Sequence, residues 1–422
     1  MTASGSAARS GTRHVVVAGA GIAGLVLALA LKGACGAALA VTVCDPGLAE
    51  GAARQRGRAY AVAAGGRLML ERLGIWERIL HAAEPITEMV VSDSRVADPV
   101  RPVFLTFAEP DADASEGTFA HMVEAAPLTE ALLAACRTEG VALVRAGVVS
   151  AKPSGTGIAA VLSDGRELRV SLVVAADGAR SRLREAAGIG FVGWSYPQSG
   201  IVATIGHARP HGGRAMEHFL PSGPFAILPL PDGGVLGHRS SIVWTERKAD
   251  IPALLGGSAR ETLAEIERRF TPSLGRLVLE DGPSAHPLAF GIARRFRSER
   301  LALLGDAAHV IHPLAGQGLN LGLAGAAALA EAVTDALRLG LDPGSEDVLA
   351  AYERSRRFDT VAMAAATDGL NRLFSNDILP VRLVRDLGLG LVDRMPGLKR
   401  LFIGEAAARR GGLPRLLRGE PI

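Results

Sequence analysis

The chain has 422 residues and a mass of 43.7 kDa, more than one simple core normally holds, which predicts two domains with a further segment. Its 48% hydrophobic and 21% charged residues are typical of a globular protein in water. The formal net charge is +3 and no basic patch is interleaved with aromatic residues, which excludes a nucleic-acid-binding protein. The three cysteines show no CxxC spacing and indicate buried thiols in a reducing compartment.

The N-terminal sequence "MTASGSAARSGTR" contains two arginines and no acidic residue, and the run "VVVAGAGIAGLVLALAL" follows it. This order is similar to that of a signal peptide or a membrane span. The run has only 17 residues, however, carries three glycines at fixed spacing, and is not ended by a clear small-residue cleavage site. A buried strand, a turn and a helix explain it better, and we expect a cytoplasmic protein.

The first half of the chain has the pattern of a parallel sheet. Residues 14–18 form a short β-branched run, a helical pattern extends to about Lys32, and "ALAVTVCD" is a second strand. Apolar spacing predicts helices over residues 66–80 and 127–140, the second bounded by Pro127 and Gly140. The segments "VALVRAGVV", "GIAAVLSDG" and "ELRVSLVVAADG" predict further strands.

The middle of the chain, at about 190–290, has a different pattern. Alternating strands are separated by Pro and Gly, and "FAILPLPDGGVLGHRSSIVW" predicts a hairpin that turns at Asp232, Gly233 and Gly234. This is typical of an antiparallel sheet in a second domain. From about residue 316 the pattern is helical. Because the strand at 300–304 would join the sheet of the first residues, we expect the first domain to be discontinuous.

The motif "GAGIAG" (Gly19, Gly21 and Gly24) follows a strand and opens a helix. The first glycine allows a tight turn, the second lets a pyrophosphate approach the backbone, and the third allows close helix–strand packing. Asp45 ends the second strand, where a carboxylate can accept ribose hydroxyls and would repel a 2′-phosphate. The pattern predicts a site for FAD or NAD rather than NADP; the alternative is a tight turn with a helix cap.

Two later segments also place polar residues at strand ends. "VVAADGARSRLR" ends a strand at Asp177 and Gly178, with Ser181 as the expected helix cap, and it also fits a plain turn. "LLGDAAHVIHPLAGQGLNLGL" places Asp306 after a strand, where a carboxylate can hold the hydroxyls of a ribityl chain. The glycines after it open a helix, so that backbone N–H groups and the positive N-terminal end of that helix would point to the same position. This arrangement would stabilise the negative charge of a reduced flavin.

His309 and His312 lie in the same segment and raise the question of a metal. No third ligand at suitable spacing accompanies them in the sequence. We therefore expect no metal site.

The chain resembles the class A flavoprotein monooxygenases with the para-hydroxybenzoate hydroxylase fold, and within them the ubiquinone-biosynthesis hydroxylase family, over nearly its whole length. The segments that carry the resemblance are "GAGIAG", "GRAYAVAAGGRLMLERLGIWERI", "HMVEAAPL", the Asp177-Gly178 segment, "FLPSGPFAILPL", "LLGDAAH", "HPLAGQGLNLG", "YERSRRFDTVAMAAATDGLNRLFSND" and "LPRLLRGEP". The strings "HPLAGQGLN" and "DGLNRLFSN" are the specific ones, since many flavoproteins share the glycine motif.

The resemblance implies an α/β fold with an FAD-binding Rossmann-like parallel-sheet domain, an antiparallel β-sheet substrate domain and a helical C-terminal region. The FAD-binding domain would comprise residues 1–85, 121–190 and 291–345. The substrate domain would comprise residues 86–120 and 191–290, and the C-terminal region residues 346–422.

The resemblance also implies residue roles. The adenosine half of FAD would be held by Gly19, Gly21, Gly24, Asp45 and the backbone of Val148, with Arg58 near the flavin. The pyrophosphates of FAD and NAD(P)H would be served by Asp177, Gly178 and Arg184, the ribityl chain by Asp306, and the isoalloxazine edge by Gly316, Gln317, Gly318, Leu319 and Asn320.

Three departures from the family pattern involve four positions. Arg56 stands where the family usually has aspartate, Ala125 and Ala126 stand where it has asparagine and arginine, and Gly325 stands where it has aspartate. The change at Ala126 removes one FAD contact, so the departures predict weaker retention of FAD.

The reaction that the resemblance implies is aromatic hydroxylation through a C4a-hydroperoxyflavin, with NAD(P)H or another electron donor as reductant. Because the protein mainly positions the reactants and excludes water, we identify no catalytic residue. His218, His238 and His286 lie in the expected substrate domain and are candidates for a general base, with a structural role expected for each.

The implied substrate is a polyprenylated phenol or quinol intermediate of ubiquinone biosynthesis, with dioxygen as co-substrate and other proteins of that pathway as candidate partners. The apolar segment "FLPSGPFAILPL" would line its pocket. Two alternatives stay open: a class A hydroxylase of another small aromatic compound, and a non-catalytic flavoprotein that scaffolds a biosynthetic complex.

Residues 381–422 hold nine Lys or Arg against four acidic residues, and apolar residues recur between them at helical spacing. One interpretation is a basic amphipathic helix that contacts an anionic membrane, such as the inner membrane, from the cytoplasm. The other is a helix packed on the FAD-binding domain with a solvated basic face.

Overall fold

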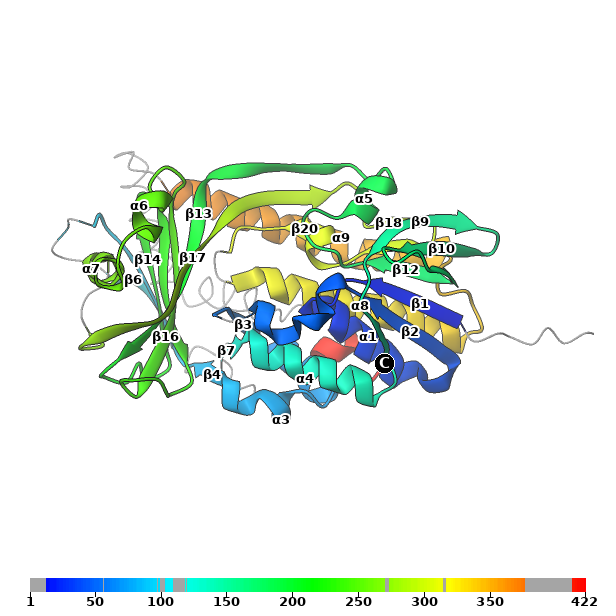
Figure 1. The fold of residues 1–422 in the computed structure, drawn as a ribbon, viewed down its shortest axis with the longest axis horizontal. Helices are drawn as coiled ribbons and strands as arrows, with labels where there is room; N and C mark the ends of the chain where they lie inside the picture. Colours follow the sequence, from blue (N-terminus) through cyan, green and yellow to red (C-terminus); the bar gives the residue numbers. More distant parts are fainter. Residues whose placement is uncertain are drawn as a thin grey trace, which may run out of the picture.

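The fold is given by a computed structural model that describes residues 13–55, 57–96, 98, 103–108, 118, 120–269, 273–313, 316–375 and 412–422. A parallel sheet and a larger antiparallel sheet lie at opposite ends of the molecule, and two long strands run between them (Figure 1). This arrangement confirms the predicted α/β fold class. Of the basic segment 381–422, residues 381–411 lie outside the described residues, so both interpretations of the segment stay predictions.

The parallel sheet has six strands in the order β18 (Arg297–Ser298), β19 (Leu301–Leu303), β12 (Leu172–Ala175), β1 (Arg13–Ala18), β2 (Leu39–Cys44) and β8 (Ala142–Val144). All neighbours pair in parallel except β18 and β19. Val15, Val16 and Val17 at the centre of β1 are fully buried, as both faces of a parallel sheet are covered.

Helices cover one face of this sheet and a small antiparallel sheet covers the other (Figure 1). The helices are α1 (Ile22–Cys35), α4 (Ala125–Thr138) and α8 (Gln317–Arg338), and the small sheet consists of β9 (Val148–Ser154), β10 (Gly157–Leu162) and β11 (Glu167–Val170). Their buried side chains belong to one hydrophobic core that also includes the β1 valines.

The antiparallel sheet has eight strands in the order β20 (His309–Val310), β17 (Leu277–Ala293), β13 (Phe191–His207), β16 (His238–Arg247), β15 (Gly223–Leu230), β14 (Arg214–Leu220), β5 (Glu88–Asp93) and β6 (Val103–Ala108). Only β14 and β5 pair in parallel. The predicted hairpin is present, because β15 and β16 pair on either side of Gly233 and Gly234, which both have positive φ.

A three-stranded sheet of β3 (Ala59–Ala63), β7 (Ala120–Glu124) and β4 (Ala83–Ile86) adjoins the antiparallel sheet. The remaining helices are α2 (Ala64–Arg72), α3 (Trp76–Ile79), α5 (Arg182–Ala186), α6 (Ile251–Leu255), α7 (Ala259–Arg269) and α9 (Glu346–Phe374), and the 3₁₀ turns are η1 (Gly36–Ala38), η2 (Pro46–Ala49), η3 (Gly51–Gln55), η4 (Leu80–Ala82), η6 (Gly305–Ala307) and η8 (Arg415–Arg418). The helix expected over 66–80 is divided into α2 and α3, with Gly74 at a φ of 67° between them.

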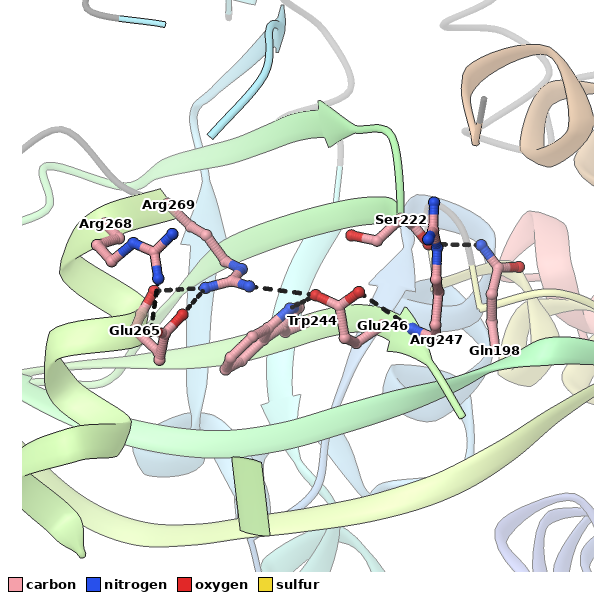
Figure 2. Close-up of polar contacts among 8 residues, drawn as sticks. All are labelled: Gln198, Ser222, Trp244, Glu246, Arg247, Glu265, Arg268 and Arg269. Carbon is pink, nitrogen blue, oxygen red and sulfur yellow. Dashed lines mark hydrogen bonds and ion pairs between the residues drawn. The ribbon is translucent and has the colours of Figure 1, made fainter. Parts of the chain in front are cut away.

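The antiparallel sheet has two different faces. Its outer face packs against α6 and α7, through a core that includes Ile201, Trp244 and Ile266. A buried ion pair holds α7 there: the Arg269 guanidinium lies 3.2 Å from Glu246 Oε2 and 4.2 Å from the centre of the Trp244 ring (Figure 2). Among the described helices, none is both long and apolar enough to cross a membrane.

Candidate active site

The turn between β1 and α1 leaves space beside one of its three glycines. Gly19 has a φ of 121°, and a Cβ there would lie 2.1 Å from the carbonyl oxygen of Ala176. A Cβ at Gly24 would lie 2.3 Å from the carbonyl oxygen of Gly19. Both glycines are therefore required by the protein's own packing. Gly21 differs, since its φ is −69° and a Cβ there would meet no atom within 4 Å.

Asp45 lies beside this turn at the end of β2. Its carboxylate accepts hydrogen bonds from the backbone N–H groups of Ala20 at 2.9 Å and Gly47 at 2.6 Å. The N–H of Gly19 in turn donates to the carbonyl oxygen of Cys44 at 2.8 Å. These bonds hold the acid at the strand end where it can also accept ribose hydroxyls.

A pocket of about 550 Å³ brings predicted residues of the adenosine and pyrophosphate sites together. It is lined by Gly19, Gly21, Asp45, Val148, Asp177 and Gly178, together with other residues. A larger pocket, of about 650 Å³, is lined by Arg294, Arg295 and Arg297 and contains none of the predicted site residues. Geometry and chemistry therefore favour the smaller pocket for a dinucleotide.

Arg184 lies outside the smaller pocket. Its side chain is buried, donates to the carbonyl oxygens of Ala307 at 3.0 Å and Ala179 at 3.0 Å, and stacks on Phe191 at 3.9 Å. It thus joins the Asp177 turn to the Asp306 turn, which is a positioning role. The arginines that do line the pocket are Arg180 and Arg182, both exposed.

Arg58, Tyr60 and Asp306 gather at the other end of the site. Burial raises the pKa of Tyr60, while the Arg58 guanidinium acts to lower it and the Asp306 carboxylate to raise it. Burial among protein atoms also raises the pKa of Asp306, and Arg58 counteracts this shift. Asp306 remains accessible to solvent, so its carboxylate is available to a ligand. His286 joins the group, because burial and then Arg58 lower its pKa.

The N-terminus of α8 is fixed to β3 beside these residues. Gly316 caps the helix with a φ of 64°. The side-chain amide of Asn320 donates to the carbonyl oxygen of Ala61 at 2.9 Å and its oxygen accepts from the Ala63 N–H at 3.0 Å. Asn320 is therefore occupied by the protein backbone. A Cβ at Gly318 would meet no atom within 4 Å, so this glycine leaves an open space on the helix.

These residues fit an FAD molecule. Gly21 and Gly318 have neither a strained backbone nor a neighbour that a methyl group would strike, so protein packing does not explain them. Close approach of a ligand does explain them. The two glycines lie at the N-termini of α1 and α8, where free N–H groups favour negative charge.

The inner face of the antiparallel sheet, meaning the face toward β3 and β7, closes the site. A small pocket of about 150 Å³ shows this contact: Arg58 and Ala59 line one wall, and Thr204 and Ser241 of the sheet line the other. His286 lies on the same face, since it pairs with Gly200, two residues before Val202 and four before Thr204 on β13.

Two of the three histidine candidates have clear structural roles. The His218 ring bonds to the hydroxyls of Ser92 at 2.7 Å and Ser94 at 3.0 Å. His238 Nδ1 bonds to Asp232 at 2.7 Å in the hairpin. The third, His286, lies near Arg58 and makes no hydrogen bond with its ring to another described residue. As a general-base candidate it stays a prediction.

His309 and His312 are buried, and burial lowers the pKa of each to about 4. Both imidazoles are therefore neutral near pH 7. Within the described part of the chain, no group of three His, Cys, Asp or Glu could hold a metal ion. His312 instead packs edge-on against Tyr196, with ring centres 5.3 Å apart.

Of the described positions that depart from the family pattern, Gly325 has a local explanation in the packing around it. A Cβ at Gly325 would lie 3.1 Å from Leu304 Cδ1 and 3.6 Å from the Tyr352 hydroxyl. That hydroxyl donates to the carbonyl oxygen of Leu303 at 2.8 Å, so α8 and α9 pack closely around this glycine. Ala125 begins α4, and its N–H donates to the carbonyl oxygen of Arg58 at 2.9 Å. Arg56 lies outside the described residues.

Sequence reasoning missed three residues. Arg180 and Arg182 line the dinucleotide pocket, and their position before and at the start of a short helix was a usable signal. Glu217 is the single acidic residue of strand β14, next to the histidine that was considered. An isolated acid in such a strand is itself a signal of a special environment.

Comparison with known proteins agrees with this geometry. Residues 12–367 match a protein family described as an FAD binding domain. The chain is 45% identical over 421 residues to the ubiquinone hydroxylase UbiL of Rhodospirillum rubrum, which covers 97% of this chain and 93% of that protein. It is 38% identical over 239 residues to the 3-demethoxyubiquinol 3-hydroxylase of Escherichia coli, covering 57% of this chain and 60% of that protein.

Solved structures show the same fold. The p-nitrophenol 4-monooxygenase PnpA from Pseudomonas putida superposes with a TM-score of 0.75 at 20% sequence identity. The match covers 94% of this chain and 99% of that one, so both sheets and the connections between them are shared.

Proposed function

This chain belongs to the FAD-binding family that includes the ubiquinone hydroxylases, and from that premise we propose that it hydroxylates the aromatic ring of a polyprenylated phenol on the route to ubiquinone. The observation that carries the proposal is the pocket of about 550 Å³ that brings the glycine turn and Asp45 together. Arg58 and Asp306 form a second polar group, and Arg58 also lines a small pocket against the inner face of the antiparallel sheet.

The described residues would hold FAD along this line. Gly21 and the N-terminus of α1 would receive the pyrophosphate, with Arg180 and Arg182 neutralising its charge. Asp45 would bind the ribose and Asp306 the ribityl hydroxyls. The N-terminus of α8 at Gly318 would lie against the isoalloxazine. When bound, FAD supplies the redox chemistry that activates dioxygen, with NAD(P)H or another donor as the source of electrons.

The chain's own residues then position the ring and exclude water. The inner face of the sheet is mostly apolar near β14 and β15, where Ala215 and Leu230 pack with Met122 of β7. Such a wall would accept the aromatic head and the first isoprene units while it keeps water from the reacting oxygen. Arg58 would add positive charge where negative charge develops on the flavin and on the phenol.

The experiment is a chromosomal deletion of the coding sequence followed by identification of the accumulated quinone intermediate by mass. We expect the deletion strain to accumulate a polyprenylated phenol that lacks one ring hydroxyl. Expression of the wild-type chain should restore ubiquinone. Normal ubiquinone in the deletion strain would contradict the proposal. Hydroxylation of small soluble phenols without any effect on ubiquinone would favour a hydroxylase of another aromatic compound.

A non-catalytic scaffold makes a different prediction for the purified protein. The FAD-loaded chain would then bind the phenol without consuming NAD(P)H or dioxygen.

Contact with an anionic membrane, or with other proteins of the pathway, is also part of the proposal. It would bring the polyprenyl substrate to the site, and binding to anionic liposomes that is lost at high salt would support it.

A further inference from the structure

Glu217 lies on the inner face of the antiparallel sheet. Side chains alternate along β14, so Ala215, Glu217 and Phe219 share one face and Met216, His218 and Leu220 the other. Met216 and Leu220 pack in the outer core with the residues of α6 and α7. Ala215 packs with Met122 of β7, on the opposite side. Glu217 therefore faces the FAD-binding part of the molecule.

The surroundings of Glu217 are apolar. It pairs with Val91 of β5 on one side and with Ala226 of β15 on the other. The Glu217 side chain is partly exposed, and no hydrogen bond or ion pair joins its carboxylate to another described residue. A carboxylate with no protein partner has free acceptor positions for the hydroxyl of a ligand.

The electrostatic environment agrees with this geometry. Burial alone raises the pKa of Glu217 to about 7. On β5, Asp93 lies on the same face as Val91, since it pairs with Phe219, two residues along β14 from Glu217. Arg239, on β16, is engaged by Glu124 and Glu280. Arg58 lies beside His286 and Thr204, several strands away across the sheet.

We propose that Glu217 is the residue that accepts the proton of the substrate's phenolic hydroxyl, so that the ring is bound as a phenolate when it is hydroxylated. The proposal rests on the proposed function, because it assigns a role in the same site. One proton moves from the phenol oxygen to a carboxylate oxygen, and the electron pair of the O–H bond stays on the phenol. Electron density then rises at the ring carbons ortho and para to that oxygen, where an electrophilic oxygen attacks.

The neighbouring His218 does not meet the requirements for this proton acceptor. His218 points to the outer face and both of its nitrogens bond to serine hydroxyls. A proton acceptor must be free of fixed partners, and Glu217, on the inner face, has no hydrogen bond or ion pair to another described residue. Burial also raises the pKa of Glu217 to about 7, close to the pH at which a general base works best.

The first test uses ligand binding to the FAD-loaded protein and requires no turnover. The probes are 2-methoxyphenol and its methyl ether, which lacks the acidic proton, and binding is followed by the change in the flavin spectrum. For the wild type we expect the phenol to bind more tightly as the pH rises through about 7, the pKa of Glu217. In Glu217→Gln we expect affinity for the phenol to fall roughly 10-fold or more and to lose this pH dependence.

The methyl ether and a second variant are the controls. The methyl ether should bind equally to the wild type and to Glu217→Gln. Glu88→Gln removes a carboxylate of β5 that pairs with Arg214 at 2.6 Å on the surface, and it should leave phenol binding unchanged. If Glu217→Gln binds the phenol with the affinity and pH profile of the wild type, the proposal is overturned.

The second test measures hydroxylation. With a phenol that the wild type hydroxylates, Glu217→Gln should lower kcat about 100-fold or more and abolish the acid limb of the pH–rate profile, while FAD content stays the same. An unchanged profile would refute the role of Glu217 and leave the hydroxylase function intact. If the wild type binds phenols with the expected pH dependence and hydroxylates none, the proposed function fails while the proton-acceptor role stands.

Discussion

The side-chain amide of Asn320 donates a hydrogen bond to the carbonyl oxygen of Ala61 at 2.9 Å, across 259 positions of the sequence. Asn320 also accepts from the N–H of Ala63 at 3.0 Å. The first turn of α8 is thereby fixed to β3, the strand that directly follows Arg58. One side chain therefore holds two parts of the expected flavin site together, and its replacement should affect both stability and FAD binding.

We expect Asn320→Ala to destabilise the protein by about 1–3 kcal/mol, because two backbone groups lose their partner. FAD affinity should fall as well, since β3 and α8 can then move apart. Asn320→Asp is the matched variant: it keeps the acceptor for Ala63 and loses the donor to Ala61. Urea unfolding and FAD titration should place it between wild type and alanine. Equal stability of all three proteins would mean that the two bonds do not hold the site.

The glycines provide a test that separates ligand binding from folding. Gly21→Ala and Gly318→Ala should leave the free energy of unfolding of the apoprotein unchanged or slightly higher, because the added methyl groups meet no protein atom. Both should weaken FAD binding, since the ligand would occupy that space. Gly24→Ala should instead destabilise the fold, because its Cβ would lie 2.3 Å from the carbonyl oxygen of Gly19.

Thermal unfolding of apoprotein and FAD titration measure the two effects separately. A Gly21→Ala protein that binds FAD as tightly as wild type would show that the turn does not approach the cofactor. A Gly24→Ala protein of normal stability would contradict the packing argument.

Local sequence patterns predicted which residues lie close together at the glycine turn, but they could not predict orientations that depend on distant contacts. The glycine turn and Asp45 follow from a strand, a turn and a helix in succession, and the structure places them in one pocket. Arg184 was assigned to the pyrophosphates by the family resemblance, but the helix α5 that Ser181 caps turns its side chain into the protein and leaves Arg180 and Arg182 at the pocket. The cap bond from the Arg184 N–H to Ser181 at 3.0 Å fixes this orientation.

The substrate side of the site shows the same limit. The sequence predicts that β14 alternates its faces but not which face meets the FAD-binding part, because the helices that cover the outer face come later in the chain. His218 was considered because it lies in the expected substrate domain, although Glu217 is the residue that faces inward. The bond between Asn320 and Ala61 is equally invisible to local patterns, since it depends on how two remote segments pack.

Acid should destabilise the protein through buried histidines. Burial lowers the pKa of His121, His309 and His312 to about 4, against an ordinary value of 6.5. Between these two values the unfolded chain binds protons that the folded chain does not, so the free energy of unfolding falls as the pH decreases from about 6.5 to about 4. Each histidine contributes up to about 1.4 kcal/mol per pH unit in this window.

Unfolding in urea at a series of pH values measures this slope. His309→Gln should reduce it, even if the variant is less stable at pH 7. A free energy of unfolding that does not change through the window would show that these imidazoles are already protonated in the folded protein.

The last prediction concerns the ion pair of α7 and compares the loss of two neighbouring arginines, Arg269 and Arg268. The Arg269 and Glu246 side chains are only 10% and 7% exposed, and the guanidinium also bonds to Glu265 at 2.5 Å and stacks on Trp244 (Figure 2). Arg268 pairs with the same Glu265 but is 62% exposed. Arg269→Ala should cost about 3–5 kcal/mol, because it leaves the Glu246 carboxylate buried without its partner. Arg268→Ala should cost less than about 1 kcal/mol, because exposed pairs contribute little.

A third protein separates the charge from the packing. In Arg269→Met with Glu246→Leu, both charges are replaced by apolar groups, and we expect most of the lost stability to return. Urea unfolding of the three variants gives the comparison. If Arg268→Ala and Arg269→Ala cost the same, the pair is not buried in solution and α7 is held mainly by its apolar contacts through Ile266.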